Sequence, residues 1–328
     1  MPRKNIFIDI MKTVINFLVK EKVFSFLIVL FILTSVLTPS FLTADNISNL
    51  LTQIGLYGIV TLGMTFAIIG GEFDLGVGSM ISLSGVLVVL LQPHFGLLPA
   101  IVLTLISGSL LGLLSGLLVA KAKINSFIVT FGAMVTLKGL ALTVAKGVPV
   151  PSKSQILNNI GNMNLFGISV IFFVFIILLL ICHFILSNTR FGRNIYAIGG
   201  NVVVAQTSGI PVAFYKGALF VITLLMASIS GIFFAARINS GHPTIGDDAP
   251  LTVIAAVVIG GTSLVGGKGN IIRTLLGISV MMLLPNSFDN LVIQPYFQRI
   301  IKGAIIVTVV AFDSYNKKKT EAKSQLQG

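Results

Sequence analysis

A few charged side chains stand between or inside long apolar stretches of this sequence. Glu72 and Asp74 interrupt one apolar stretch, Asp247 and Asp248 form a second acidic turn, and Lys138 lies within an apolar run. Ionisable groups in a hydrocarbon environment are costly and commonly mark the path of an ion or a polar solute. No His or Cys accompanies the carboxylates in sequence, so they form no hydrolytic constellation.

The residues that we expect to line a solute pathway are Glu72, Asp74, Lys138 and Asn286. Other interpretations of the same residues stay open. The carboxylates could be solvated loop residues or helix N-caps, with Asp74 well placed before the next helix. Lys138 marks a cavity or an ion pair, or else its long side chain carries the ammonium to the membrane surface.

A glycine-rich stretch, GGTSLVGGKG at Gly260–Gly269, invites comparison with nucleotide-binding loops. The pattern G-x-x-x-x-G-K-[ST], anchored on Gly267 and Lys268, requires a glycine and a hydroxyl where the chain has Thr262 and Gly269. The hydroxyl that would coordinate Mg²⁺ is therefore missing in this register. The sequence predicts a tight turn between two helices and no cofactor in this chain, so any ATP and Mg²⁺ must be held by a partner.

The histidines and the cysteine show no metal-binding pattern. His94, His183 and His242 lie in separate segments, without the paired spacing of a metal site. The single cysteine, Cys182, cannot form an internal disulfide. We expect no metal site.

The elements that must position these residues are membrane spans. Hydrophobic residues make up 55% of the 328 residues and charged residues 10%, and the mean hydropathy is +1.01, values outside the range of soluble domains. A span needs roughly 20 helical residues, and the sequence predicts an all-α polytopic membrane protein with about ten transmembrane helices. The predicted spans are Val23–Thr43, Ile47–Gly70, Gly76–Leu91, Leu97–Ala120, Ser126–Ala145, Leu165–Ser187, Ala213–Ile238, Leu251–Val265, Asn270–Pro285 and Phe297–Ala311.

The third, eighth and ninth of these spans are short, as in broken or re-entrant helices. Small residues at four-residue spacing, Gly108, Gly112 and Gly116, predict close helix packing. The acidic turns after the second and seventh spans give a weak sign of an inverted repeat.

The net charge of +12 comes from basic residues at the ends of apolar runs, which leaves no compact basic face for nucleic acid. With the N-terminus inside, most Lys and Arg residues fall in cytoplasmic connections. We therefore predict that both termini are cytoplasmic. The predicted segments are a cytoplasmic N-terminal segment at 1–22, a transmembrane domain at 23–313 and a cytoplasmic basic tail at 314–328.

Several ordered motifs resemble those of one transporter family. The connection after the sixth span reads TRFGRNIYAIGGN at Thr189–Asn201 and VAQTSGIP at Val204–Pro211. The other motifs are GEFDLGVGS at Gly71–Ser79, SFIVTFG at Ser126–Gly132 and IAAVVIGGTSLVGG at Ile254–Gly267. Over about residues 45 to 313, the chain resembles permeases of the ribose, xylose and autoinducer-2 branch of bacterial ABC importers.

The resemblance implies a fold, a location and partners. The fold would be that of a type II ABC importer-like permease in the bacterial cytoplasmic (inner) membrane. The chain would pair with a second permease copy, as a homodimer or heterodimer, bind cytoplasmic ABC ATPase subunits and receive solute from a periplasmic or lipid-anchored binding protein. The implied function is translocation of a monosaccharide or similar small polar solute by alternating access, so the chain is a transport subunit and not an enzyme.

The resemblance also makes the loop at 188–212 the coupling loop that docks on the ATPase. Asn201 can cap a short helix that ends near Gly209. An ordinary cytoplasmic connector is the alternative interpretation. The implied coupling residues are Arg190, Gly192, Arg193, Tyr196, Gly199, Gly200, Asn201, Ala205, Gly209, Ile210 and Pro211.

The chain departs from the family pattern in two places. Phe73 replaces the usual Ile or Val, and Ala249-Pro250-Leu251-Thr252 stands where Tyr-Glu-Leu-Asp is usual, which leaves the particular solute open. A secondary transporter or channel is the alternative function, and it would need ion-coupling residues buried in the spans. An intramembrane enzyme would need a catalytic cluster, and the sequence shows none.

Overall fold

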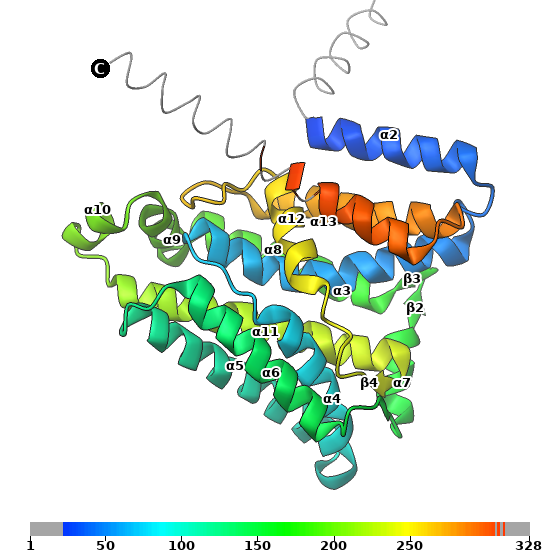
Figure 1. Cartoon of the computed structure of the whole chain (residues 1–328), viewed down its shortest axis with the longest axis horizontal. Helices are drawn as coiled ribbons and strands as arrows, with labels where there is room; N and C mark the ends of the chain where they lie inside the picture. Colours follow the sequence, from blue (N-terminus) through cyan, green and yellow to red (C-terminus); the bar gives the residue numbers. More distant parts are fainter. Residues whose placement is uncertain (1–21, 306, 309–310, 312–328) are drawn as a thin grey trace, which may run out of the picture.

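The computed structural model describes residues 22–305, 307–308 and 311. These residues fold into a mainly helical bundle (Figure 1). The predicted cytoplasmic segment at 1–22, except Lys22, and the predicted basic tail at 314–328 lie outside the described residues, as does part of the predicted last span.

Within the described residues, 7 helices are long and apolar enough to cross a membrane. They are α3 (Ala44–Ile69), α4 (Val77–Phe95), α5 (Leu97–Ala120), α6 (Ser126–Val144), α8 (Val170–Asn188), α11 (Val212–Ile238) and α13 (Ile271–Asn290). Two shorter apolar helices are α2 (Lys22–Leu37) and α12 (Ala249–Ile259), and residues 295–305 are also helical. The predicted membrane protein is confirmed, whereas the predicted count of about ten spans is not.

The connections hold small elements. Strand β1 (Val150–Pro151) pairs antiparallel with β4 (Ser240–Gly241), and β2 (Asn164–Leu165) pairs with β3 (Ile168–Ser169). The short helices are α7 (Gln155–Asn162), α9 (Arg190–Gly200) and α10 (Val202–Thr207). As Figure 1 shows, α9 and α10 lie at one end of the bundle, and α7 with the strands lies at the other end. Within the residues that the structure describes, the all-α prediction missed these two-residue strands.

Several predicted boundaries were wrong, for local reasons. The first span ends at Leu37 rather than Thr43, because Pro39 follows and the Thr43 hydroxyl caps α3. The sixth begins at Val170 rather than Leu165, because the hairpin of β2 and β3 occupies the preceding residues.

The last helices also differ from the prediction. The eighth span ends at Ile259 rather than Val265, because the Gly260-Gly261 turn follows, with φ +87° at Gly261. The ninth continues through Pro285 to Asn290. A membrane helix tolerates an internal proline when neighbouring groups satisfy the freed backbone.

Helix α3 is the most enclosed span. In its most apolar 18-residue segment 89% of the residues are buried inside the protein, against 22% for α5 and α6, which therefore lie at the outside of the bundle. Helix α11 packs against α3, α4 and α5. The predicted close packing is confirmed on α5, where a Cβ at Gly108, Gly112 or Gly116 would overlap with α11.

Candidate functional site

Two long helices are each followed by an interruption and then by a helix that begins inside the bundle. Residues 70–76 separate α3 from α4, and residues 239–248 separate α11 from α12. Helix α12 has 11 residues. At 1.5 Å per residue it is about 16 Å long, roughly half of a 30 Å hydrocarbon core. It cannot cross a membrane alone.

Asp74 places the first interruption deep in the protein. Its carboxylate is fully buried, accepting a 2.8 Å hydrogen bond from Thr223 Oγ1 in the middle of α11 and a 2.9 Å bond from the Gly76 N–H. The second bond satisfies a backbone donor at the start of α4, where helices leave such groups unpaired. Asp74 therefore fixes where α4 begins.

The first turn of α4 meets the second interruption at Gly78 and Gly246. A Cβ on either glycine would overlap with the carbonyl oxygen of the other, so the backbones are in contact. The Gly246 N–H also donates a 3.0 Å hydrogen bond to Ser82 Oγ on α4. We call this contact the junction.

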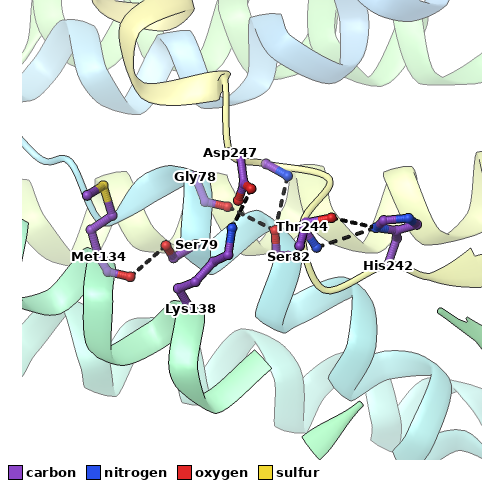
Figure 2. Close-up of polar contacts among 9 residues, drawn as sticks. Gly78, Ser79, Ser82, Met134, Lys138, His242, Thr244 and Asp247 are labelled. Atoms are coloured by element: carbon purple, nitrogen blue, oxygen red, sulfur yellow. Dashed lines mark hydrogen bonds and ion pairs between the residues drawn. The ribbon is translucent and has the colours of Figure 1, made fainter. Parts of the chain in front are cut away.

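Lys138 of α6 closes one side of the junction through an ion pair with Asp247 (Figure 2). Their side chains are 30% and 44% exposed, and both line a cleft of about 250 Å³ together with Gly78 and Pro250. Nearby, Ser79 Oγ donates a 2.7 Å hydrogen bond to the Met134 carbonyl, which holds α4 to α6. Lys138 thus has its partner in the second acidic turn.

Glu72 lies at the other end of the first interruption. It is buried and forms an ion pair with Lys216, in the first turns of α11. The pair lines a cleft of about 730 Å³ that also includes Gln206 and Pro211 of the predicted coupling loop. Glu72 therefore belongs to the end of the bundle that carries α9 and α10.

Asn286 lies away from the other three predicted pathway residues. Its Nδ2 donates a 2.8 Å hydrogen bond to Asn46 Oδ1 at the start of α3, and its backbone oxygen accepts a 2.8 Å bond from Asn290 Nδ2. The structure therefore places Lys138 at the junction and Asp74 in the interruption before α4, and it places Glu72 and Asn286 toward opposite ends of the bundle. The four residues do not form one site.

The predicted coupling loop contains two helices. Thr189 caps α9 through a 3.3 Å hydrogen bond from the Gly192 N–H, and Asn201 caps α10 through bonds from Val203 and Val204. Gly209 follows α10 with φ +80°, as expected for a turn after a helix. The predicted short helix capped by Asn201 is confirmed.

The other predicted coupling residues divide between surface and packing. Arg190, Arg193, Gly200 and Pro211 are exposed, Ile210 is half-buried, and Ala205 is buried. Gly192 lies close to the Leu186 backbone, where a side chain would not fit.

A glycine contact joins α9 to the transmembrane helices. A Cβ at Gly199 would overlap with Ile69 at the end of α3 and with Gly267, whose N–H donates a 2.8 Å bond to the Ile69 carbonyl. Tyr196 reinforces this contact, since its hydroxyl donates a 2.8 Å hydrogen bond to the Gly269 carbonyl. Burial raises the pKa of Tyr196, so this hydroxyl keeps its proton.

The glycine-rich stretch at 260–269 forms the predicted turn between α12 and α13. Gly266 and Gly267 have φ values of +93° and +71°, which a side chain would strain. Sequence reasoning did not find that this turn also packs on α9. Paired glycines at Gly199-Gly200 and Gly266-Gly267 were the available signal.

Within the described residues, no group of three or more His, Cys, Asp or Glu side chains could hold a metal ion. Cys182 is buried on α8.

Interrupted spans that meet inside a membrane bundle, with a separate helical unit packed on one end, are typical of transport proteins. The family model for the branched-chain amino acid transport system / permease component matches residues 46–310. The chain belongs to this permease family and is a membrane transport component rather than an enzyme.

Sugar permeases are among its relatives. The ribose import permease protein RbsC of Haemophilus influenzae is 36% identical over 308 residues, covering 92% of this chain and 94% of the relative. RbsC of Bacillus subtilis is 37% identical, covering 88% and 90%. The L-arabinose transport system permease protein AraH of Escherichia coli is 36% identical, covering 88% and 89%. No solved structure matches the chain. The resemblance to the sugar-permease branch is confirmed.

Proposed function

We propose that the chain is the transmembrane permease subunit of an ABC importer, which carries a monosaccharide or similar small polar solute across the cytoplasmic membrane by alternating access. Relatives named as ribose and arabinose permeases match nearly the whole chain and support this solute class over an amino acid.

One observation carries the proposal most directly. The unit of α9 and α10 packs on both α3 and the turn between α12 and α13, through Gly199, Ile69 and Gly267. A push on this unit is therefore applied to the end of α3, which borders the first interruption, and to the turn that follows α12. That is the arrangement a partner ATPase needs in order to move the junction.

The surface of α10 suits a partner protein. Val203 is 70% exposed and Val204 58% exposed, and such apolar residues beside charged Arg190 and Arg193 commonly mark a protein interface. We place this end in the cytoplasm, since the positive-inside rule favours it. The complete assembly then has ten spans per permease with both termini cytoplasmic, two permease copies, ATP and Mg²⁺ on ATPase subunits, and a solute-binding protein outside.

The test is co-purification of the chain with its ATPase from mild detergent, followed by an uptake assay with D-ribose and L-arabinose. Wild type should retain an ATPase, and Val203→Glu should lose it, because a carboxylate cannot be buried in an apolar interface without cost. The matched control is Val148→Glu, which changes a residue that is 60% exposed at the other end of the bundle.

A wild-type chain that purifies without an ATPase in several mild detergents, yet transports in vesicles, would support a secondary transporter instead. Loss of the ATPase in both variants would indicate general misfolding rather than a docking surface on α10. Retention of the ATPase by Val203→Glu would count against the assignment of this unit as the coupling loop.

A further inference from the structure

A polar cleft lies at the end of the bundle away from α9 and α10. It has a volume of about 490 Å³ and is enclosed by α3, α11 and α13. Helix α3 contributes Asn46, Asn49, Gln53 and Tyr57, spaced so that they follow one face of the helix. From Asn46 to Tyr57 this stripe runs about 16 Å toward the bundle centre. Polar groups at such depth in a membrane protein are unusual and mark function.

The polar groups at the mouth of the cleft are held in fixed positions. The Arg237 guanidinium donates 2.7 Å hydrogen bonds to the side-chain oxygens of Asn49 and Asn162. Asn286 donates to Asn46 Oδ1 at 2.8 Å on the opposite wall. The hydrogen-bond partners given for Arg237 in the described part of the chain are neutral amides, so its charge is not paired there, although Asp289 lines the same cleft. Pre-organised groups lose little entropy when a ligand binds.

The deeper part of the cleft combines free polar groups with an aromatic surface. The Tyr57 and Phe234 rings contact each other edge to face, with centroids 5.4 Å apart. Within the described part of the chain, neither the Gln53 amide nor the Tyr57 hydroxyl has a hydrogen-bond partner. Both therefore keep donors and acceptors available for a bound molecule.

We propose that this cleft is the outward-facing subsite for a neutral polyhydroxyl solute. Amides donate to and accept from hydroxyl groups, and the aromatic rings suit the C–H face of a sugar. Arg237 and Asp289 also line the cleft, so a zwitterionic amino acid is the competing ligand, and the measurements below distinguish it from a sugar. The inference rests on the proposed function, since it names where the transported solute first meets the permease.

The direct test is protection of an introduced cysteine by sugar. In a Cys182→Ser background, which removes the single native thiol, Gln53→Cys is exposed to a membrane-impermeant methanethiosulfonate in right-side-out vesicles holding the complete importer. Millimolar D-ribose, L-arabinose, D-xylose or D-galactose should slow labelling severalfold, whereas L-leucine should not. The control is Val148→Cys, which is exposed at the same end and outside the cleft, and whose labelling should not respond to sugar.

Two results would overturn the subsite. One is that Gln53→Cys stays unlabelled while Val148→Cys reacts, which would mean that water does not reach the cleft. The other is that none of the sugars protects Gln53→Cys, or that only leucine does.

A second measurement separates this inference from the proposed function. Uptake of the same sugars is measured for wild type and for Gln53→Leu, which should lower uptake roughly tenfold through lost hydrogen bonds while the ATPase still co-purifies. Sugar uptake without protection at position 53 leaves the function standing and removes the subsite. Protection without ATP-dependent uptake keeps the subsite and removes the importer function.

Discussion

Gly78 and Gly246 touch backbone to backbone, although they follow two different interrupted helices. Each lies where a Cβ would overlap with the carbonyl oxygen of the other. The Gly246 N–H is satisfied by Ser82 Oγ at 3.0 Å, so the contact is also hydrogen bonded. The start of α4 and the segment before α12 therefore cannot separate or approach further without changing the junction.

The first prediction concerns this contact. Gly246→Ala should destabilise the purified protein by about 1–3 kcal/mol, the usual effect of adding atoms to a tightly packed site. Gly139→Ala on α6 is the control, because its Cβ would meet nothing within 4 Å and alanine favours a helix. The free energy of unfolding of both variants is measured in detergent. Equal stability of Gly246→Ala and wild type would contradict the close contact.

The second prediction concerns Lys138 and Asp247. Asp247→Asn and Lys138→Met should each destabilise the junction, because each leaves one charge unpaired near the membrane interior. In a double-mutant cycle the coupling should be about 0.5–1 kcal/mol, since both side chains are partly exposed. The charge reversal Lys138→Asp with Asp247→Lys should recover function in an uptake assay. Additive single effects would show that the two side chains do not interact.

The third prediction concerns Glu72 and Lys216. Glu72→Gln should destabilise the protein by about 3 kcal/mol, because it strands a charge in a largely buried pair. The combined variant Glu72→Leu with Lys216→Met should recover much of that loss, since it removes both charges and keeps apolar packing. Denaturant unfolding of wild type and the two variants checks this order. If Glu72→Gln were at least as stable as the combined variant, that result would contradict a buried ion pair between Glu72 and Lys216.

The fourth prediction is a pH dependence at Tyr196. Burial raises the pKa of Tyr196 above its ordinary value of 10.0, so the folded state holds the phenolic proton more tightly than the unfolded state. The resulting stability is complete below pH 10.0 and is lost as pH rises through the folded-state pKa. Tyr196→Phe removes one hydrogen bond, about 1 kcal/mol, together with this titration.

Unfolding midpoints of wild type and Tyr196→Phe, measured from neutral to alkaline pH, test the prediction. The difference between them should be constant at neutral pH and should shrink in the alkaline range. A difference that grows with pH would have the wrong sign for a raised pKa.

The class of protein and most of its helices could be predicted from the amino-acid sequence. Composition and the length of apolar runs depend only on the chain, and a lipid bilayer forces such runs into helices. The caps could also be predicted locally, as for Asn201 and Gly209 around α10, because capping involves residues within one turn. The ordered motifs identified the sugar-permease branch for the same reason, since they are contiguous stretches.

The tertiary structure alone decided which of these residues meet. Hydropathy marked Lys138 and Asp247 as unusual separately, but their pairing joins residues 109 positions apart, and no local pattern encodes such a contact. The same holds for Gly78 with Gly246 and for Gly199 with Gly267, where the fit of two backbones is a property of packed helices. Glu72, Asp74, Lys138 and Asn286 shared polarity in an apolar sequence, yet only packing showed that they serve different places. The polar stripe of Asn49, Gln53 and Tyr57 went unrecognised because its meaning depends on the cleft that α11 and α13 complete.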